Sequence, residues 1–317
     1  MALEKHFGDR LAAAVTRLAS PVCVGLDPRW KQLPDSLRRD GGTSWQAMAE
    51  AYARFCNGVC DVVAPLAPVV KVQAAFFEEL GPAGMTAMGQ VIAHAREQGL
   101  LVIVDGKRND IGSTAEAYAR AYLGRAQSAW GADALTVNPY LGDDSLQPFV
   151  EIAIERGAGI FVLVKTSNPG GRMLQDVKTD GGTIYQRVGA AVEEMARGCQ
   201  GECGYGCVGA VVGATYPQQL AELRADMPHT WFLVPGYGSQ GGTAADVAAG
   251  FDARGLGAIV NNSRGILFAH ERPEYARFGA ARWQEAVDAA TREMIDELRA
   301  VVKGLGTGTV RPGLPDD

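Results

Sequence analysis

Short apolar runs recur along the chain, and each ends in polar residues or in glycine or proline. Most gaps between the runs contain a segment with helical spacing. Apolar residues repeat at i, i+3, i+4 and i+7 from Trp45 to Val59, and again from Ala115 to Leu123. We therefore predict helices in the gaps and strands at eight runs: Val22–Leu26, Val69–Val72, Leu101–Val104, Leu135–Val137, Ile160–Val164, Ala210–Val212, Phe232–Val234 and Ala258–Val260.

These runs are continuously apolar instead of alternating, which is typical of parallel strands covered on both faces. Eight such strands with intervening helices predict an α/β fold, a TIM (β/α)8 barrel. A doubly wound open sheet is the alternative, but the first strand is followed by a segment, Gly25–Trp30, with one glycine and no G-x-G-x-x-G motif. We expect a single domain over 1–317, with an extra N-terminal helix at about 7–18, the barrel at about 21–302 and a flexible tail at 304–317.

Composition narrows the classes of protein. The chain has 317 residues, of which 47% are apolar and 21% charged, and this balance excludes disordered and collagen-like proteins. With 30 basic and 36 acidic side chains the net charge is −6, so there is no basic footprint for a nucleic-acid polymer. An anionic ligand must therefore be held by a local pocket.

The chain also lacks the signals of a membrane or exported protein. No apolar run approaches the roughly 18 residues of a membrane span. The segment Met1–Arg10 carries charges of both signs and no apolar core of a signal peptide, so we expect a cytoplasmic protein. Six cysteines in a chain of this size do not make a disulfide scaffold, and Cys56 and Cys60 are interpreted as reduced core thiols.

Charged residues collect at the predicted strand ends, where a barrel places its active site. Asp27 follows the first strand, Lys71 lies in the second, and Asp105 follows the third. Asp105 and Lys107 are two residues apart and are expected on the same face of the chain. A buried Lys71 needs a carboxylate partner, which Asp105 on the neighbouring strand is expected to supply. The alternative for Asp-x-Lys is a solvated ion pair in a surface turn.

The loops after the last two predicted strands are rich in glycine or contain an arginine. Pro235–Gly242 contains four glycines, and Asn261–Gly265 contains an arginine. Loops after strands seven and eight of a barrel commonly bind phosphate, through backbone N–H groups and a forked guanidinium. Gly236, Ser263 and Arg264 are therefore candidate binding residues for a phosphorylated small molecule. The alternative is that the glycines only form tight turns.

The segment Asp105–Thr114, DGKRNDIGST, resembles the signature of the orotidine 5′-phosphate decarboxylase family in its longer bacterial branch. Further segments match in order between about Pro21 and Phe268: Val24–Pro28, Lys71, Asn138–Gly142, Lys165–Gly170, Pro235–Gly242 and Ser263–Gly265.

The resemblance implies a homodimeric barrel that converts orotidine 5′-monophosphate to UMP and carbon dioxide without a metal or organic cofactor. Lys71, Asp105 and Lys107 would come from one subunit and Asp110 from the other, as an array of alternating charge. The implied substrate contacts are Asp27 and Lys71 at the ribose hydroxyls, Ser167 and Gln240 at the pyrimidine edge, Gln240 and Arg264 at the phosphate, and Ile111 and Thr114 in the partner's site.

The chemistry agrees with this assignment. Loss of carbon dioxide from C6 leaves an electron pair in the plane of the ring, where the π system cannot delocalise it. An ammonium such as that of Lys107 can stabilise this carbanion and then protonate it, while Asp105 and Asp110 keep the lysine charged and in place.

Two other functions are possible for a barrel of this kind, and the charged residues argue against both. A magnesium-dependent phosphosugar or ketoacid-phosphate decarboxylase on the same barrel would need a carboxylate on the second strand, which carries Lys71 instead. A non-catalytic binding barrel would be expected to lose one member of the charged quartet, and all four are present.

Several residues stay outside this assignment. Asn109 stands where the family pattern has glycine, and since asparagine tolerates left-handed backbone we expect the turn to survive. Lys165 ends the fifth strand without a role. Cys199, Cys203 and Cys207 are interpreted as part of a glycine-rich loop, with a metal site or a disulfide as the alternative. The four histidines are interpreted as surface or packing residues: His6, His94, His229 and His270.

Overall fold

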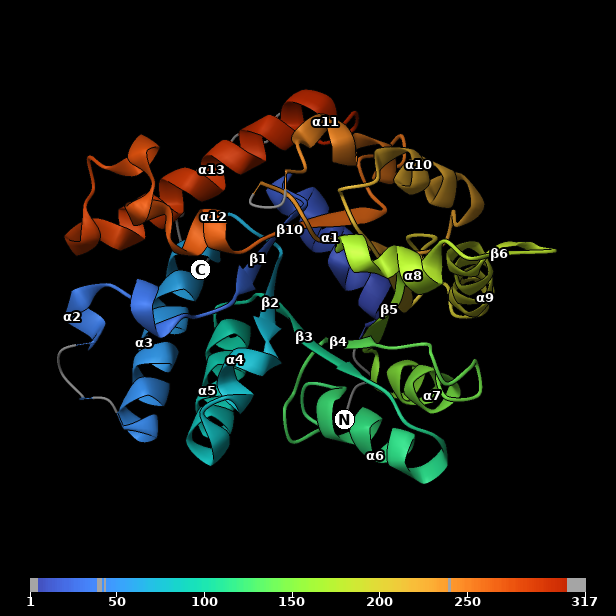
Figure 1. The fold of residues 1–317 in the computed structure, drawn as a ribbon, viewed down its shortest axis with the longest axis horizontal. Helices are drawn as coiled ribbons and strands as arrows, with labels where there is room; N and C mark the ends of the chain where they lie inside the picture. The colour runs from blue at the N-terminus through green and yellow to red at the C-terminus, as the bar shows by residue number, and fades with distance from the viewer. Residues whose placement is uncertain (1–4, 39–41, 43, 239–240, 307–317) are drawn as a thin grey trace, which may run out of the picture.

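The computed structural model describes residues 5–38, 42, 44–238 and 241–306. Within these residues, eight parallel strands close into a barrel in the order β1-β10-β9-β8-β5-β4-β3-β2 (Figure 1). The barrel strands are β1 (Val22–Leu26), β2 (Val69–Gln73), β3 (Leu101–Arg108), β4 (Ala134–Val137), β5 (Gly159–Lys165), β8 (Val208–Val212), β9 (Phe232–Val234) and β10 (Ala258–Asn262). The predicted TIM barrel is confirmed, and the open sheet is not formed.

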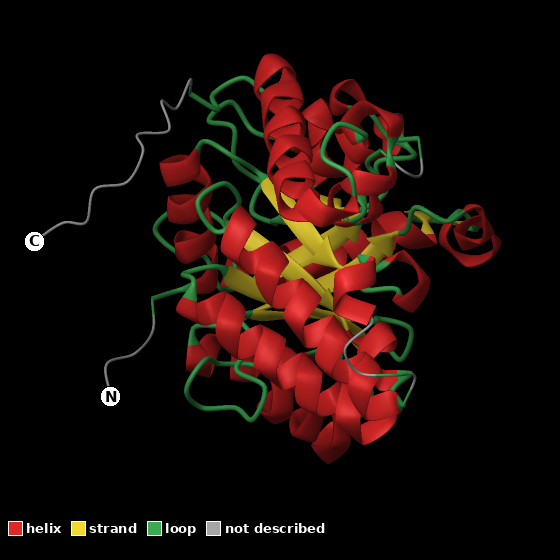
Figure 2. Ribbon diagram, turned by 90° about the vertical axis from the view of Figure 1, so that its left-hand side faces the viewer, coloured by secondary structure: helices red, strands yellow, loops and turns green. Residues whose placement is uncertain are grey.

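Helices enclose the strands (Figure 2). They are α1 (Phe7–Leu18), α2 (Asp35–Arg38), α3 (Trp45–Val63), α4 (Ala74–Glu78), α5 (Gly81–Glu97), α6 (Gly112–Tyr122), α7 (Gln147–Arg156), α8 (Arg172–Gln175), α9 (Ile184–Gly198), α10 (Pro217–Asp226), α11 (Ala244–Val247), α12 (Arg264–Leu267) and α13 (Trp283–Val301). Short 3-10 helices, η1 to η6, lie at Trp30–Gln32, Pro169–Gly171, Ala248–Gly250, Ala269–Glu271, Pro273–Tyr275 and Ala280–Arg282. A small antiparallel hairpin, β6 (Lys178–Thr179) with β7 (Gly182–Thr183), stands apart from the barrel.

The local signals in the sequence account for most of these elements. Helix α3 begins after Ser44, whose side chain accepts a hydrogen bond from the Ala47 N–H, and it buries the predicted apolar face, including Phe55 and Val59. Strand β3 is four residues longer than its apolar run. Its extension to Arg108 pairs with Val137 after a shift of register.

The extra N-terminal helix is confirmed as α1, and it packs at the N-terminal end of the barrel. Phe7 meets Phe161 edge to face, with ring centroids 6.0 Å apart. A Cβ atom on Gly159, the first residue of β5, would lie 2.3 Å from the Phe7 ring, so only glycine allows this contact. The predicted single-domain organisation stays a prediction, and most of the tail predicted at 304–317 lies outside the described residues.

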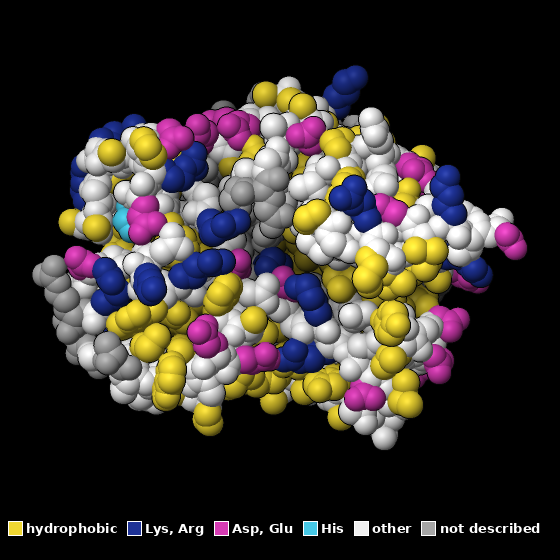
Figure 3. All heavy atoms as spheres, viewed as in Figure 1, with side chains coloured by type: hydrophobic (Ala, Val, Ile, Leu, Met, Phe, Trp, Pro, Cys, Tyr) yellow, Lys and Arg dark blue, Asp and Glu magenta, His cyan; other side chains and the backbone are white. Residues whose placement is uncertain are grey.

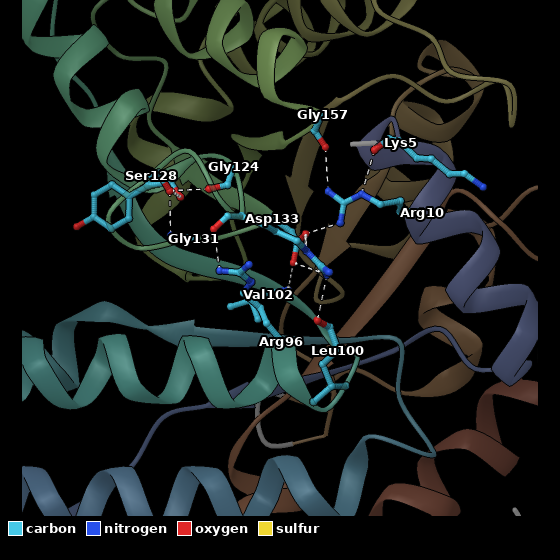
Figure 4. A network of polar contacts seen from close by, with 12 residues as sticks. Lys5, Arg10, Arg96, Leu100, Val102, Gly124, Ser128, Gly131, Asp133 and Gly157 are labelled. Atoms are coloured by element: carbon cyan, nitrogen blue, oxygen red, sulfur yellow. Dashed lines mark hydrogen bonds and ion pairs between the residues drawn. The ribbon is translucent and has the colours of Figure 1, made fainter. Parts of the chain in front are cut away.

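A buried carboxylate ties several distant segments together at this same end (Figure 4). Asp133, just before β4, is fully buried. It pairs with Arg10 of α1, with Arg125 at 2.7 Å, and with the Val102 N–H at 2.9 Å. Because it lies at the opposite end from the predicted active site, we interpret this network as structural.

Candidate active site

Three barrel strands bring four charged side chains together. Lys71 Nζ lies 2.9 Å from Asp105 Oδ2 and 3.9 Å from Asp27 Oδ1. Lys107 Nζ lies 2.5 Å from the other oxygen of Asp105. The result is a row, Asp27, Lys71, Asp105, Lys107, in which each charge neighbours an opposite one. The predicted pairing of Lys71 with Asp105 is confirmed, and a solvated surface turn is not what the structure has.

The middle of the row is buried, and its Lys107 end is accessible. Lys71 and Asp105 are buried, whereas 48% of the Lys107 side chain is exposed. Burial by itself would raise the pKa of Asp105, but the ammonium groups of Lys71 and Lys107 outweigh it and hold that pKa well below its usual range. Burial would likewise lower the pKa of Lys71, and the carboxylates of Asp105 and Asp27 raise it instead. The buried pair is therefore ionised at neutral pH.

Two further residues donate hydrogen bonds to Asp105, and neither was predicted from the sequence to be a site residue. Gln73 Nε2 donates to Asp105 Oδ2 at 2.9 Å, and Thr136 Oγ1 donates to Oδ1 at 2.9 Å. Gln73 lies two residues after Lys71 on the same strand. Thr136 is the polar residue inside the apolar run of β4. The signals that could have found them are the position of Gln73 at the end of β2 and that of Thr136 as a polar residue within an apolar strand.

The turn after Asp105 differs from the expectation. Among the described non-glycine residues, Ala19 and Lys107 have positive φ, and Lys107 has φ 46°. Asn109 does not have positive φ, so the turn at this position does not use the tolerance of asparagine for left-handed backbone. The Lys107 N–H donates to Thr136 Oγ1 at 2.9 Å, and this hydrogen bond ties the turn to the neighbouring strand β4. The strained residue is thus the lysine that faces the barrel mouth.

Asp110 does not join the charged row of its own chain. Within the described part of the chain it makes no ion pair, and its Oδ1 accepts the N–H of Ile111 at 2.8 Å. Ile111 is 59% exposed and Thr114 is exposed at the start of α6. Within a single chain, Ile111 and Thr114 are therefore exposed to solvent.

The loops after β9 and β10 lie side by side, as predicted. Gly238, Gly242, Asn262 and Arg264 line one cavity of about 970 Å³ that extends towards α13. Gly236 and Ser263 belong to the same two loops. Gln240 lies outside the described residues. Basic side chains gather around the centre of this face of the molecule (Figure 3).

The glycines of the first loop also fold it onto itself. The Gly238 N–H donates to the Gly242 carbonyl at 2.8 Å, and the Gly242 N–H donates to the Gly236 carbonyl at 3.1 Å. Gly236 has φ 101°, a conformation that favours glycine. Tight-turn formation is therefore at least part of why these glycines are present.

Ser167 lies just beyond the end of β5. Its carbonyl accepts a hydrogen bond from Thr215 Oγ1 at 3.0 Å. A Cβ atom on Gly213 would lie 2.7 Å from the Ser167 Cα, so the chain after β8 approaches this residue closely. Ser167 is thus held between two strand ends at the barrel mouth.

The cysteines and histidines are not members of the charged row, although Cys23 of β1 is buried close to Lys71. All six cysteines are free thiols, and Cys56 and Cys60 are buried, as predicted. Cys199 and Cys207 flank the predicted glycine-rich loop, with their sulfur atoms 3.1 Å apart. The described residues contain no group of three or more His, Cys, Asp or Glu side chains arranged to hold a metal ion. None of the helices within the described ranges has the length and apolarity needed to cross a membrane.

Comparison with known proteins decides the family. The model of the Orotidine 5'-phosphate decarboxylase / HUMPS family matches residues 20–277. The chain belongs to this family. As a member of the orotidine 5'-phosphate decarboxylase / HUMPS family, it is 58% identical over 298 residues to the orotidine 5'-phosphate decarboxylase of Rhodopirellula baltica, covering 92% of this chain and 99% of the relative.

Solved structures agree with this membership of the orotidine 5'-phosphate decarboxylase family. A putative orotidine 5'-phosphate decarboxylase from Streptomyces avermitilis has 38% identity and a TM-score of 0.78, covering 95% of this chain and 97% of that one. The OMP decarboxylase of Leishmania donovani has 34% identity and a TM-score of 0.72, covering 93% and 98%. The resemblance seen in the sequence is confirmed at the level of family and fold.

Proposed function

We propose that this protein decarboxylates orotidine 5′-monophosphate to UMP and carbon dioxide, in the synthesis of pyrimidine nucleotides. The observation that carries the proposal is the row of alternating charges at the barrel mouth, in which Asp105 holds the Lys107 ammonium at 2.5 Å. Its support is the family membership and a relative of that name with 58% identity. The row has Lys71 where the magnesium-dependent alternative needs a carboxylate.

Lys107 is the proposed general acid. As the bond from C6 to the carboxylate carbon breaks, its electron pair stays on C6 in the ring plane. The Lys107 ammonium stabilises this developing charge and then donates a proton to C6, so that UMP and carbon dioxide are the products. Asp105 holds the ammonium in position before the substrate binds, and this preorganisation lowers the reorganisation cost in the transition state.

The other proposed roles are those that the family resemblance implies. Asp27 and Lys71, at the end of the row away from Lys107, bind the ribose hydroxyls. Ser167 and Gln240 bind the pyrimidine edge, and the phosphate is held by Arg264 and Gln240 together with the loop residues Gly236 and Ser263. Binding energy from the phosphate, which is remote from C6, can be used in the transition state, so the phosphate site contributes to catalysis. The reaction as proposed uses no metal or organic cofactor.

We further propose a homodimer with shared active sites. Asp110 and Ile111 directly precede α6, and Thr114 lies in its first turn. Among the described residues Asp110 makes no ion pair with the charged row of its own chain, and Ile111 and Thr114 are exposed. Tyr140 and Leu141, which follow the adjacent strand β4, are exposed apolar residues. A second copy packed here would cover this apolar surface and bring its Asp110 towards Lys107.

We place the protein in the cytoplasm. This is supported by the composition, because six cysteines in 317 residues do not make the disulfide scaffold that is typical of small secreted domains.

The test is direct. Purified protein is mixed with orotidine 5′-monophosphate, the loss of the orotate ultraviolet absorbance is followed, and UMP is identified by chromatography. Activity should be equal with and without excess EDTA. Absence of product contradicts the proposal, and activity that EDTA abolishes and magnesium restores favours the metal-dependent alternative.

A further inference from the structure

Lys165, at the C-terminal end of β5, is a fully buried lysine that the proposed mechanism does not use. Its Nζ forms an ion pair with Asp176 and lies 4.6 Å from the ring centre of Tyr216 and 5.3 Å from that of Tyr185. Burying an ammonium is costly unless it is paired. An apolar residue would fill the strand end without this desolvation cost, so we expect the Lys165 ammonium to have a specific role.

The segment after β5 indicates what this role is. Residues 166–184 form a loop that includes η2, α8 and the β6–β7 hairpin, and none of its residues is buried. Met173 of α8 is 84% exposed. Apolar packing therefore does not hold the loop against the barrel, and polar contacts must do so.

Those contacts come from two consecutive residues, Gln175 and Asp176. The Gln175 side chain accepts from the Thr166 N–H at 3.1 Å and donates to Thr166 Oγ1 at 2.8 Å. Asp176 pairs with Lys165. Gln175 and Asp176 of the loop thus contact Thr166 and Lys165, the two residues that directly precede Ser167.

Ser167 is the residue whose position these contacts determine. On its other side the Gly213 N–H donates to the Lys165 carbonyl at 2.7 Å, and Thr215 holds the Ser167 carbonyl. The main chain from Lys165 to Ser167 is consequently fixed from the loop and from β8 together.

We propose that the Lys165–Asp176 pair is a latch that positions Ser167 against the pyrimidine ring of the substrate. Both are positioning residues, since neither is placed to touch the substrate in this arrangement. The inference rests on the proposed function only for the role of Ser167. The latch itself, a buried ion pair that fastens an otherwise unpacked loop, is a separate claim that can be tested separately.

The first experiment tests the latch without using activity. Arg172 and Lys178 are exposed in the loop and are cleavage sites for trypsin. Asp176→Asn should make cleavage at these sites at least several-fold faster than in the wild type, and Asp176→Glu, which keeps the carboxylate, should restore much of the protection. The matched control is Asp133→Asn, which breaks a buried ion pair at the opposite end of the barrel. Unchanged cleavage in Asp176→Asn overturns the latch.

The second experiment tests the positioning of Ser167 by a double-mutant cycle. Asp176→Asn should lower kcat/KM by on the order of a hundredfold at most, as expected for a misplaced contact, and the loss should largely disappear in a Ser167→Ala background. Lys165→Met/Asp176→Asn, which removes both charges, should show the same loss with little change in thermal stability. Asp133→Asn should lower thermal stability without lowering kcat/KM.

The outcomes separate the two claims. Additive effects of Asp176→Asn and Ser167→Ala overturn the positioning role while leaving the proposed function intact. A Ser167→Ala variant with wild-type kcat/KM instead contradicts the proposed role of Ser167, and the positioning claim falls with it, whereas the proteolysis result still decides whether the latch exists.

Discussion

Lys107 Nζ lies 2.5 Å from Oδ1 of Asp105, two residues earlier on the same strand. The lysine main chain is left-handed, and its N–H is anchored to Thr136. Both ends of this side chain are therefore fixed, although nearly half of it is open to the barrel mouth. A fixed and accessible ammonium is what stabilisation of a localised carbanion requires.

Lys107→Ala should lower kcat by roughly 10²–10⁴-fold, because the variant loses both the electrostatic stabilisation and the proton donor. UMP should still bind with nearly unchanged affinity, measured by titration calorimetry, since the ribose and phosphate contacts remain. Lys178→Ala, at an exposed lysine of β6, is the control. Near-normal turnover of Lys107→Ala would contradict the assignment.

Asp105→Asn should lower the free energy of unfolding by about 3–5 kcal/mol at pH 7, because Lys71 is then buried without its main partner. The pH dependence has a definite sign. In the wild type the two lysines outweigh burial and lower the pKa of Asp105, so its carboxylate stabilises the fold above the unfolded-state pKa of about 4. That contribution is lost as the pH falls through the lower folded-state pKa.

The measurement for Asp105→Asn is urea unfolding of both proteins at several pH values. The difference in unfolding free energy should be full at pH 7 and shrink below about pH 4. A difference that stays constant down to the acid limit of folding would argue against a stabilising Asp105 carboxylate.

Arg264→Ala should lower kcat/KM for the nucleotide by roughly 10- to 150-fold, which corresponds to about 1.5–3 kcal/mol for a hydrogen bond to a charged group. The nucleoside without phosphate never uses this contact, so its kcat/KM should change little. Steady-state kinetics with both substrates checks this. Equal impairment of both would mean that Arg264 supports the fold of the site instead of binding phosphate.

Mixing Lys107→Ala with Asp110→Ala should restore activity that neither variant has alone. In a heterodimer one of the two sites receives an intact Lys107 from one chain and an intact Asp110 from the other, so random exchange should recover about a quarter of the wild-type activity. Subunit exchange is followed with differently tagged chains. Demonstrated exchange without recovery would rule out shared sites.

Much of this protein follows from local sequence. The positions of the barrel strands could be predicted because a parallel strand covered on both faces needs a continuous apolar run, and the run itself carries that information. Asp27, Lys71, Asp105 and Lys107 could be predicted as neighbours because barrel topology brings strand ends together. The glycine-rich loop and Arg264 were recognisable for the same reason.

Contacts between segments far apart in sequence could not be predicted in this way. Nothing near Asp105 indicates that Thr136 will bond to it, and nothing near Lys165 indicates Asp176 as its partner. The left-handed residue is Lys107 and not Asn109, because the hydrogen bond that the Lys107 N–H donates to the neighbouring strand outweighs the conformational preference of either residue. Local propensities differ by about 1 kcal/mol or less, and a buried, charge-assisted contact exceeds that, so the partner that the closed barrel supplies decides the geometry.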